Sequence, residues 1–229
     1  MENIILDPRD GPDNSGEIAT YARNVFMGYL GDEGQTRASF TDDEKYFRSG
    51  DCGSFDSDGF LTVTGRLKEI AITSAGKNIA PAPVEAAVKA KLGDVVSYAV
   101  LVADKRKFPT ALLTLKVEVD PATQLPTDKL DARAREWCRN ECGEEVLTTS
   151  DFVRGKNAEK LHAGLAAGIE EANENVENKA ARVKGFRVVE HEFSLPGGEL
   201  GPTLKRKRFF IMDKHKSLIE DMYNTKATA

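Results

Sequence analysis

The chain has 229 residues, 40% of them hydrophobic and 30% charged, which is typical of a globular protein with a buried core. Its formal net charge of −5 argues against a general nucleic-acid binder, because such proteins normally present a basic surface. No apolar run approaches the roughly 18 to 20 residues that span a bilayer, and the acidic start Met1-Glu2-Asn3 lacks the regions of a signal peptide.

The three cysteines, Cys52, Cys138 and Cys142, form no paired framework, which favours a reducing compartment and a cytoplasmic protein. Cys138 and Cys142 are four residues apart on a predicted helix and could both face one metal ion. The histidines offer no matching spacing for the two further ligands that such sites recruit. We therefore expect no metal site and interpret Cys138 as packing beside Trp137 in an apolar core.

The first 66 residues have the pattern of a β-rich region. Residues 16–23 alternate between apolar and polar side chains like a half-buried strand, and the polar segment 31–44 predicts a surface loop. Residues 46–48 lead into a predicted turn at Gly50-Asp51. The step Ser57-Asp58-Gly59 separates two short apolar runs and predicts a hairpin.

The pattern changes after residue 66. A strand is predicted over 69–73, followed by a tight loop over 75–78 and a helix over 84–92. This helix has prolines just before it and Gly93 as its stop. Two apolar runs dense in β-branched residues, 95–103 and 111–119, predict paired strands joined by a charged turn at 104–107.

Helical spacing follows in two stretches, which are marked by Leu130, Ala134, Trp137 and Cys138, and by Leu161, Leu165, Ile169, Ala172 and Val176. Strand character returns over 183–190, residues 196–198 open a mobile loop, and a last amphipathic helix surrounds Ile219. This mixed order favours an α+β domain. We predict a β-rich part over residues 1–66 and a second domain over 67–229.

Three segments have residue types suited to nucleotide chemistry. The carboxylate of Asp51 could accept hydrogen bonds from two neighbouring hydroxyls, although a Gly-Asp pair alone is usually only a turn. The segment Gly65-Arg66-Leu67-Lys68 could be a hinge or an exposed hairpin end. The basic segment 201–208 contains Lys205, and taken alone it could also be a solvated run or a nucleic-acid or nuclear-address signal.

In this order the three segments resemble the C-terminal third of an acyl-CoA synthetase, an adenylate-forming (AMP-binding) enzyme. The match continues through Thr73-Ser74-Ala75-Gly76-Lys77-Asn78-Ile79-Ala80-Pro81 and Val84-Glu85. The resemblance implies that Asp51 hydrogen-bonds both ribose hydroxyls of ATP and that Arg66 contacts the nucleotide. It further implies that Lys68 is the pivot on which a mobile C-terminal domain swings.

The same resemblance gives roles to two residues further along. Gly76 would lie in a loop that lines the pantetheine tunnel of CoA, where the missing side chain lets the thiol arm pass. Lys205 would be the catalytic lysine that reaches the acyl carboxylate and the α-phosphate during adenylation. Lys205 is preferred over Lys207 because Arg208 then follows three residues later, and the basic cluster 205–208 is assigned to the nucleotide.

Three further segments, 25–30, 104–116 and 193–203, are similar to the bubblegum-type long-chain acyl-CoA synthetases. The implied fold is a mobile C-terminal domain with a small mixed sheet and flanking helices, after a β-rich tail of a large N-terminal domain. The implied reaction converts a fatty acid, ATP and CoA to acyl-CoA, AMP and pyrophosphate. The phosphate loop, the Mg²⁺ ligand and most of the fatty-acid tunnel would lie before residue 1.

The chain by itself is therefore expected to be inactive, with an N-terminal AMP-binding domain as its partner in a full-length protein. Two alternatives remain open: a free-standing binding or regulatory module that docks on a full-length synthetase, and a non-functional truncated product. Peripheral contact with an internal membrane also stays possible for a lipid-handling enzyme, although no strongly amphipathic basic helix indicates it.

Overall fold

The computed structural model describes residues 1–7 and 15–224, and the chain divides into two compact units, Met1–Ile70 and Ala71–Ala229. The predicted division lay after residue 66. In the described ranges no helix is both long and apolar enough to cross a membrane.

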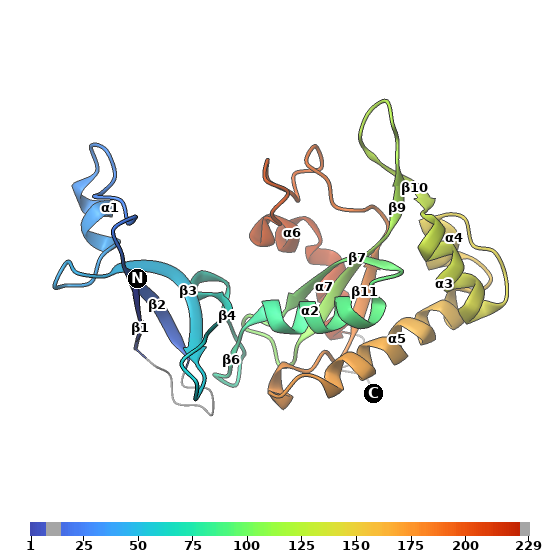
Figure 1. Ribbon diagram of the computed structural model, residues 1–229. Coiled ribbons are helices and arrows are strands. Elements are labelled where there is room, and N and C mark those ends of the chain that lie inside the picture. The colour runs from blue at the N-terminus through green and yellow to red at the C-terminus, as the bar shows by residue number, and fades with distance from the viewer. Residues whose placement is uncertain (8–14, 225–229) are drawn as a thin grey trace. The chain divides into compact units, whose positions relative to one another are not determined.

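The first unit is built on an antiparallel sheet whose four strands follow one another in chain order (Figure 1). The predicted strand from Gly16 and the predicted hairpin around residues 57–59 are confirmed. Its elements are β1 (Glu2–Leu6), β2 (Gly16–Tyr21), α1 (Glu33–Ala38), β3 (Phe47–Phe55), β4 (Leu61–Arg66) and a 3-10 turn (Leu67–Glu69).

Two predictions in this unit were wrong. The supposed loop 31–44 contains helix α1, which begins where Asp32 Oδ1 accepts the Gln35 N–H at 2.8 Å. The supposed turn at Gly50-Asp51 lies inside β3. Gly50 has φ +71°, and the register between β2 and β3 shifts between Glu17 and Ala19, so these residues form a bulge in a continuous strand.

The second unit is built on a mixed three-stranded sheet in the order β11-β8-β7, with β7 antiparallel and β11 parallel to β8. This is the α+β fold with a small mixed sheet that the sequence predicts. Its elements are β5 (Ala71–Ile72), β6 (Asn78–Ile79), α2 (Pro81–Leu92), β7 (Val96–Val102), β8 (Thr110–Leu115), β9 (Val117–Val119), β10 (Pro126–Leu130), α3 (Ala132–Cys142), α4 (Thr149–Arg154), α5 (Ala158–Glu174), a 3-10 turn (Lys179–Ala181), β11 (Phe186–Val189), α6 (Arg208–Lys214) and α7 (Lys216–Asn224).

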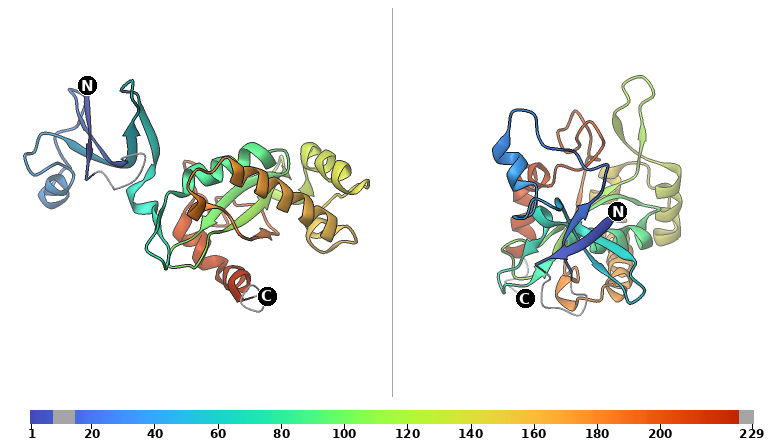
Figure 2. Two further views of the ribbon diagram at one scale, coloured as in Figure 1. Left: turned by 90° about the horizontal axis from the view of Figure 1, so that it is seen from below. Right: turned by 60° about the vertical axis from the view of Figure 1, so that its left-hand side comes forward.

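Helices cover both faces of this sheet, which explains why its strands read as continuous apolar runs (Figures 1 and 2). Alternate residues of a strand point to opposite faces. Leu101 and Leu113 therefore pack with α2, α3 and α5 on one face, and Val100 and Leu112 pack with α6 and α7 on the other. The second unit thus has two apolar cores, one on each side of its central strands.

Several predicted boundaries in the second unit were wrong. The run 111–119 is broken at Lys116, because β9 leaves the central sheet to pair with β10. Leu130 belongs to β10, so the helical spacing assigned to it begins only after Asp131, whose side chain caps α3. Of the predicted strand 69–73 only Ala71–Ile72 forms, and α5 ends at Glu174, before Val176.

The cysteines of α3 lie in the core of the second unit. Cys138 and Cys142 are both buried, and the Cys142 thiol donates to the Cys138 carbonyl oxygen at 3.1 Å. Burial raises the pKa of the Cys138 thiol to about 12. Within residues 1–7 and 15–224 no group of three or more His, Cys, Asp and Glu side chains could hold a metal ion.

Candidate functional site

Asp51 and Arg66 face each other across the β3–β4 ladder. Arg66 Nε lies 3.2 Å from Asp51 Oδ1, and the side chains keep 61% and 35% of their exposure, so a ligand can reach both. The bulge that presents Asp51 is held from behind by Ser49, whose hydroxyl donates to the Ile18 carbonyl oxygen at 2.7 Å. The two residues assigned to the nucleotide thus lie together on one exposed edge of the first unit.

Lys68 is exposed in the 3-10 turn Leu67–Glu69 that follows β4. This turn lies directly before the division between the two units at Ile70 and Ala71. A short turn at the division of two compact units is a location where a few backbone dihedrals can absorb a change of domain orientation.

Gly76 lies at the tip of the hairpin that joins β5 and β6. Gly76 N–H donates to the Thr73 carbonyl oxygen at 2.9 Å, and Thr73 N–H donates to the Lys77 carbonyl oxygen at 3.0 Å. The glycine has φ +74°, and no heavy atom lies within 4 Å of where a Cβ would be. The backbone at this tip is therefore open to a ligand that passes close to it.

The hairpin that carries Gly76 is fixed to the charged turn between β7 and β8. Lys105 N–H donates to the Ile72 carbonyl oxygen at 2.7 Å, and Ser74 N–H donates to the Arg106 carbonyl oxygen at 2.9 Å. The Arg106 guanidinium makes two hydrogen bonds to Glu220 of α7, at 3.0 and 2.5 Å. Sequence reasoning missed this support, because Arg106 and Glu220 are 114 positions apart.

Lys205 is exposed on a tight turn before α6. The turn is closed by two backbone hydrogen bonds of 2.8 Å, from Gly201 N–H to the Lys205 carbonyl oxygen and from Leu204 N–H to the Gly201 carbonyl oxygen. Leu204 takes a left-handed φ of +57° to make it. In the described part of the chain, Lys205 takes part in none of the ion pairs, so its ammonium is available to a ligand.

The two arginines of the basic cluster have another role than the one predicted for them. Arg208 Nη2 donates to Glu85 Oε1 at 2.7 Å, and Arg206 Nη1 lies 2.9 Å from Glu85 Oε2. Glu85 is only 4% exposed. Assignment of the whole cluster 205–208 to the nucleotide was therefore wrong for Arg206 and Arg208. One signal was available in the sequence: Glu85 follows Val84 on the apolar face of a predicted helix, where an unpaired charge is costly.

The structure therefore gathers the predicted residues into two groups. Asp51, Arg66 and Lys68 belong to the first unit, and Gly76 and Lys205 belong to the second. All five lie on turns, strand edges or a bulge, and all five are accessible or carry an accessible backbone.

No family model matches the chain. Solved structures show its fold: the adenylation domain of a carboxylate reductase from Mycobacterium chelonae superposes with a TM-score of 0.72 at 16% identity, over 98% of this chain and 31% of that one. O-succinylbenzoate coenzyme A synthetase from Bacillus subtilis, in complex with AMP, superposes with a TM-score of 0.54 at 22% identity, over 90% of this chain and 32% of that one. The fold is that of the adenylate-forming enzymes.

The sequence comparison points to one branch of the adenylate-forming enzymes. The chain is 41% identical over 211 residues to the long-chain-fatty-acid–CoA ligase ACSBG1 of Rattus norvegicus, which covers 92% of this chain and 29% of that protein. It is 42% identical over 212 residues to the long-chain-fatty-acid–CoA ligase ACSBG2 of Homo sapiens, and the match covers 93% of this chain and 31% of that protein. The predicted resemblance is confirmed: the chain is homologous to part of the bubblegum-type long-chain acyl-CoA synthetases, and spans about three tenths of those relatives.

Proposed function

We propose that this chain is the C-terminal portion of a long-chain fatty acid–CoA ligase. The reaction converts a fatty acid, ATP and CoA to acyl-CoA, AMP and pyrophosphate through an acyl-adenylate. The observation that carries the proposal is the 41% identity to ACSBG1 over 92% of the chain.

The proposal includes an N-terminal AMP-binding domain in the same longer protein. The chain spans about three tenths of its curated relatives. In addition, the first unit carries almost fully exposed apolar side chains at Met27 and Leu30, and neighbouring exposed apolar side chains mark surfaces that a partner covers. On this view the isolated chain has little activity, because most of the groups that position the phosphates and the acyl chain lie elsewhere.

In the first half-reaction a carboxylate oxygen of the fatty acid attacks the α-phosphorus of ATP, and pyrophosphate leaves. Asp51 accepts hydrogen bonds from the ribose hydroxyls, and Arg66 holds the nucleotide from the neighbouring strand. The exposed Lys205 ammonium stabilises the negative charge that develops between the carboxylate and the α-phosphate. Mg²⁺ would be held by residues of the N-terminal domain.

In the second half-reaction the CoA sulfur attacks the acyl carbonyl carbon, and AMP leaves. The second unit rotates about Lys68, which removes Lys205 from the reaction centre and brings the open Gly76 backbone to the pantetheine path. One small unit thereby supplies a different group to each half-reaction.

The two half-reactions can be measured separately in the longer protein that contains this chain. We expect Lys205→Ala to slow acyl-adenylate formation by about 10²- to 10³-fold, as for loss of one preorganised charge-stabilising group, and to leave thioester formation from supplied acyl-adenylate unchanged. Lys207→Ala is the matched control, because it removes an exposed lysine two residues away. Equal loss of both half-reactions in Lys205→Ala would sink the assignment.

A further inference from the structure

The carboxylate of Glu85 is buried against the free edge of the central sheet. Strand β7 is at one end of the order β11-β8-β7, so within residues 1–7 and 15–224 the outward-facing backbone groups of Ala99 and Leu101 have no neighbouring strand. The Leu101 N–H donates instead to Glu85 Oε1 at 2.8 Å. A side chain of helix α2 thus accepts a hydrogen bond from a backbone N–H that would otherwise pair with a further strand.

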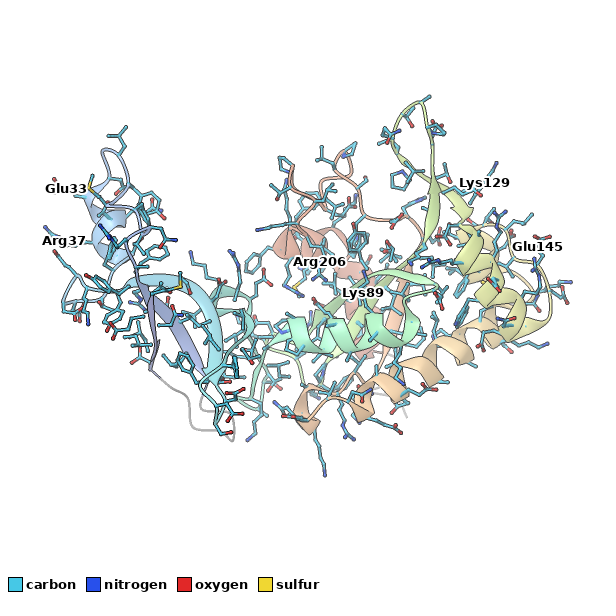
Figure 3. All side chains as sticks on the ribbon, in the orientation of Figure 1. Glu33, Arg37, Lys89, Lys129, Glu145 and Arg206 are labelled. Carbon is cyan, nitrogen blue, oxygen red and sulfur yellow. The ribbon has the colours of Figure 1, made fainter. Side chains whose placement is uncertain are left out.

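The arginines beside Lys205 bind the backbone carbonyl groups of the same strand edge. Arg206 Nη1 donates to the Ala99 carbonyl oxygen at 2.6 Å, and Arg208 Nη1 donates to the Leu101 carbonyl oxygen at 3.1 Å. Both guanidinium groups also lie against Glu85. We call Glu85, Arg206 and Arg208 the arginine clamp; Arg206 and helix α2, which carries Glu85 and Lys89, can be followed in Figure 3.

The clamp fixes which side chains of the segment around Lys205 face inward and which face the solvent. Arg206 and Arg208 point inward with side chains 31% and 9% exposed, whereas the alternate residues Lys205 and Lys207 are exposed. A shift of the segment by one residue would place a lysine against Glu85, and a lysine cannot reproduce the forked contacts of a guanidinium to a carboxylate and a carbonyl. The clamp therefore sets which cations face outward.

The clamp also lowers the electrostatic cost of the segment. Four consecutive cations, from Lys205 to Arg208, repel one another, and burial of a charge is costly unless it is paired. Glu85 supplies the buried negative charge to which two of them bind. Without it, the two guanidinium groups would lose the carboxylate that pairs with both of them.

We propose that Glu85 is a positioning residue for Lys205: through Arg206 and Arg208 it holds the turn so that the lysine is presented for adenylate formation. This rests on the proposed function. Glu85 touches no substrate, and its effect is confined to the half-reaction that uses Lys205.

The first test uses this chain alone and does not depend on activity. Amide hydrogen exchange is measured in the parent chain and in Glu85→Gln for Gly201 and Leu204, whose N–H groups close the turn, and for Lys207, whose N–H donates to the Glu199 carbonyl oxygen at 2.7 Å. We expect exchange about ten- to a hundredfold faster at these amides, the factor for loss of a charge-assisted hydrogen bond, with the amides of β8 unchanged. Unchanged exchange at the turn would overturn the proposal.

The second test measures the two half-reactions in the longer protein. Glu85→Gln should lower kcat for acyl-adenylate formation by about 10²-fold, as a displacement of about 1 Å can, with thioester formation from supplied acyl-adenylate retained. Arg206→Met is the second variant, because it keeps Glu85 paired with Arg208 and so guards against misfolding; it should give a smaller loss of the same kind. Glu85→Asp should restore part of the rate.

The outcomes separate the two proposals. If the turn loosens in Glu85→Gln while adenylation is unaffected and Lys205→Ala abolishes it, the positioning role is refuted. If Lys205→Ala itself keeps adenylation, the catalytic assignment under the proposed function fails, and the positioning role fails with it. A selective adenylation defect in both Glu85→Gln and Arg206→Met supports the inference.

Discussion

The substitution Gly76→Ala separates the stability of this chain from its proposed role in thioester formation. Gly76 has φ +74°, and no heavy atom lies within 4 Å of the Cβ that alanine would add. The methyl group therefore meets no atom of the chain, and the cost is the left-handed backbone, about 1–2 kcal/mol for a non-glycine residue. Reduced freedom of the unfolded chain offsets about 0.4–1 kcal/mol of this. We expect a net loss of about 1 kcal/mol, or about 2–4 °C in Tm.

The functional effect of the same methyl group should be much larger. If the thiol arm of CoA passes this backbone, the methyl group occupies the space that the arm needs. We expect thioester formation from supplied acyl-adenylate to fall by about 10²-fold, the loss that a displacement of about 1 Å produces in a positioned reaction. Acyl-adenylate formation should stay within about twofold of the parent, because a 1 kcal/mol change in stability leaves the protein folded.

Gly143→Ala is the matched control. Gly143 ends α3 with φ +75°, and it too has no heavy atom within 4 Å of an added Cβ. The two variants should lose the same stability in thermal unfolding, and only Gly76→Ala should lose thioester formation when the half-reactions are assayed in the longer protein. Equal thioester rates in the two variants would refute the reasoning, since backbone strain would then account for everything.

Three further predictions concern single residues. Asp51→Asn should weaken ATP binding to the longer protein about 10- to 100-fold in calorimetry, because it removes charge-assisted hydrogen bonds to ribose. The same change should alter the free energy of unfolding by less than about 1 kcal/mol, because the ion pair of Asp51 is exposed. Asn173→Ala should cost about 2–4 kcal/mol in chemical denaturation, because buried Asn173 pairs with both the N–H and the carbonyl oxygen of Val183, at 2.8 and 3.0 Å. His162→Phe should make stability less dependent on pH below 6.5, as followed by chemical denaturation. Burial, and then the charge of Arg187, lowers the pKa of this imidazole, so its contribution to stability is complete above the unfolded value of 6.5 and is lost as pH falls through the lower folded value.

The first two of these predictions have a control variant in the same chain, and the third has a result that would contradict it. Thr62→Ala, at an exposed position of β4, should leave ATP binding unchanged. Asn175→Ala removes an exposed amide that donates to the Glu171 carbonyl oxygen at 3.3 Å, and should cost less than about 1 kcal/mol. A pH profile for His162→Phe that remains as steep as that of the parent chain would contradict the assignment of the pH dependence to His162, which stacks on Phe186 at 4.3 Å.

Local sequence signals were sufficient for much of the second unit. The β-branched runs before and after residues 104–107 predicted β7 and β8 because such side chains fit a pleated, buried surface. Prolines and Gly93 marked the ends of α2, since proline suits the first turn of a helix and glycine follows the last. The order of the short motifs predicted a resemblance to long-chain acyl-CoA synthetases, which the relatives confirm.

The errors occurred where a distant part of the chain decides the local structure. Gly50-Asp51 was predicted as a turn because both residues favour turns, but pairing with β2 and β4 extends the backbone on either side and leaves only a bulge. Lys116 was predicted inside one strand, but the sheet that β9 joins depends on β10, which the pattern did not predict. Propensity is a weak indicator whenever tertiary pairing competes with it.

By itself, the sequence determined the α+β class of this protein and its resemblance to the adenylate-forming enzymes, because both depend on residues that lie close together in the chain. Only the tertiary structure decided that Arg206 and Arg208 bind Glu85 while Lys205 remains outside. Arg208 and Glu85 are 123 positions apart, and no periodicity or spacing links residues so distant. Their pairing follows from the packing of α2 and the segment before α6 against the same edge of β7.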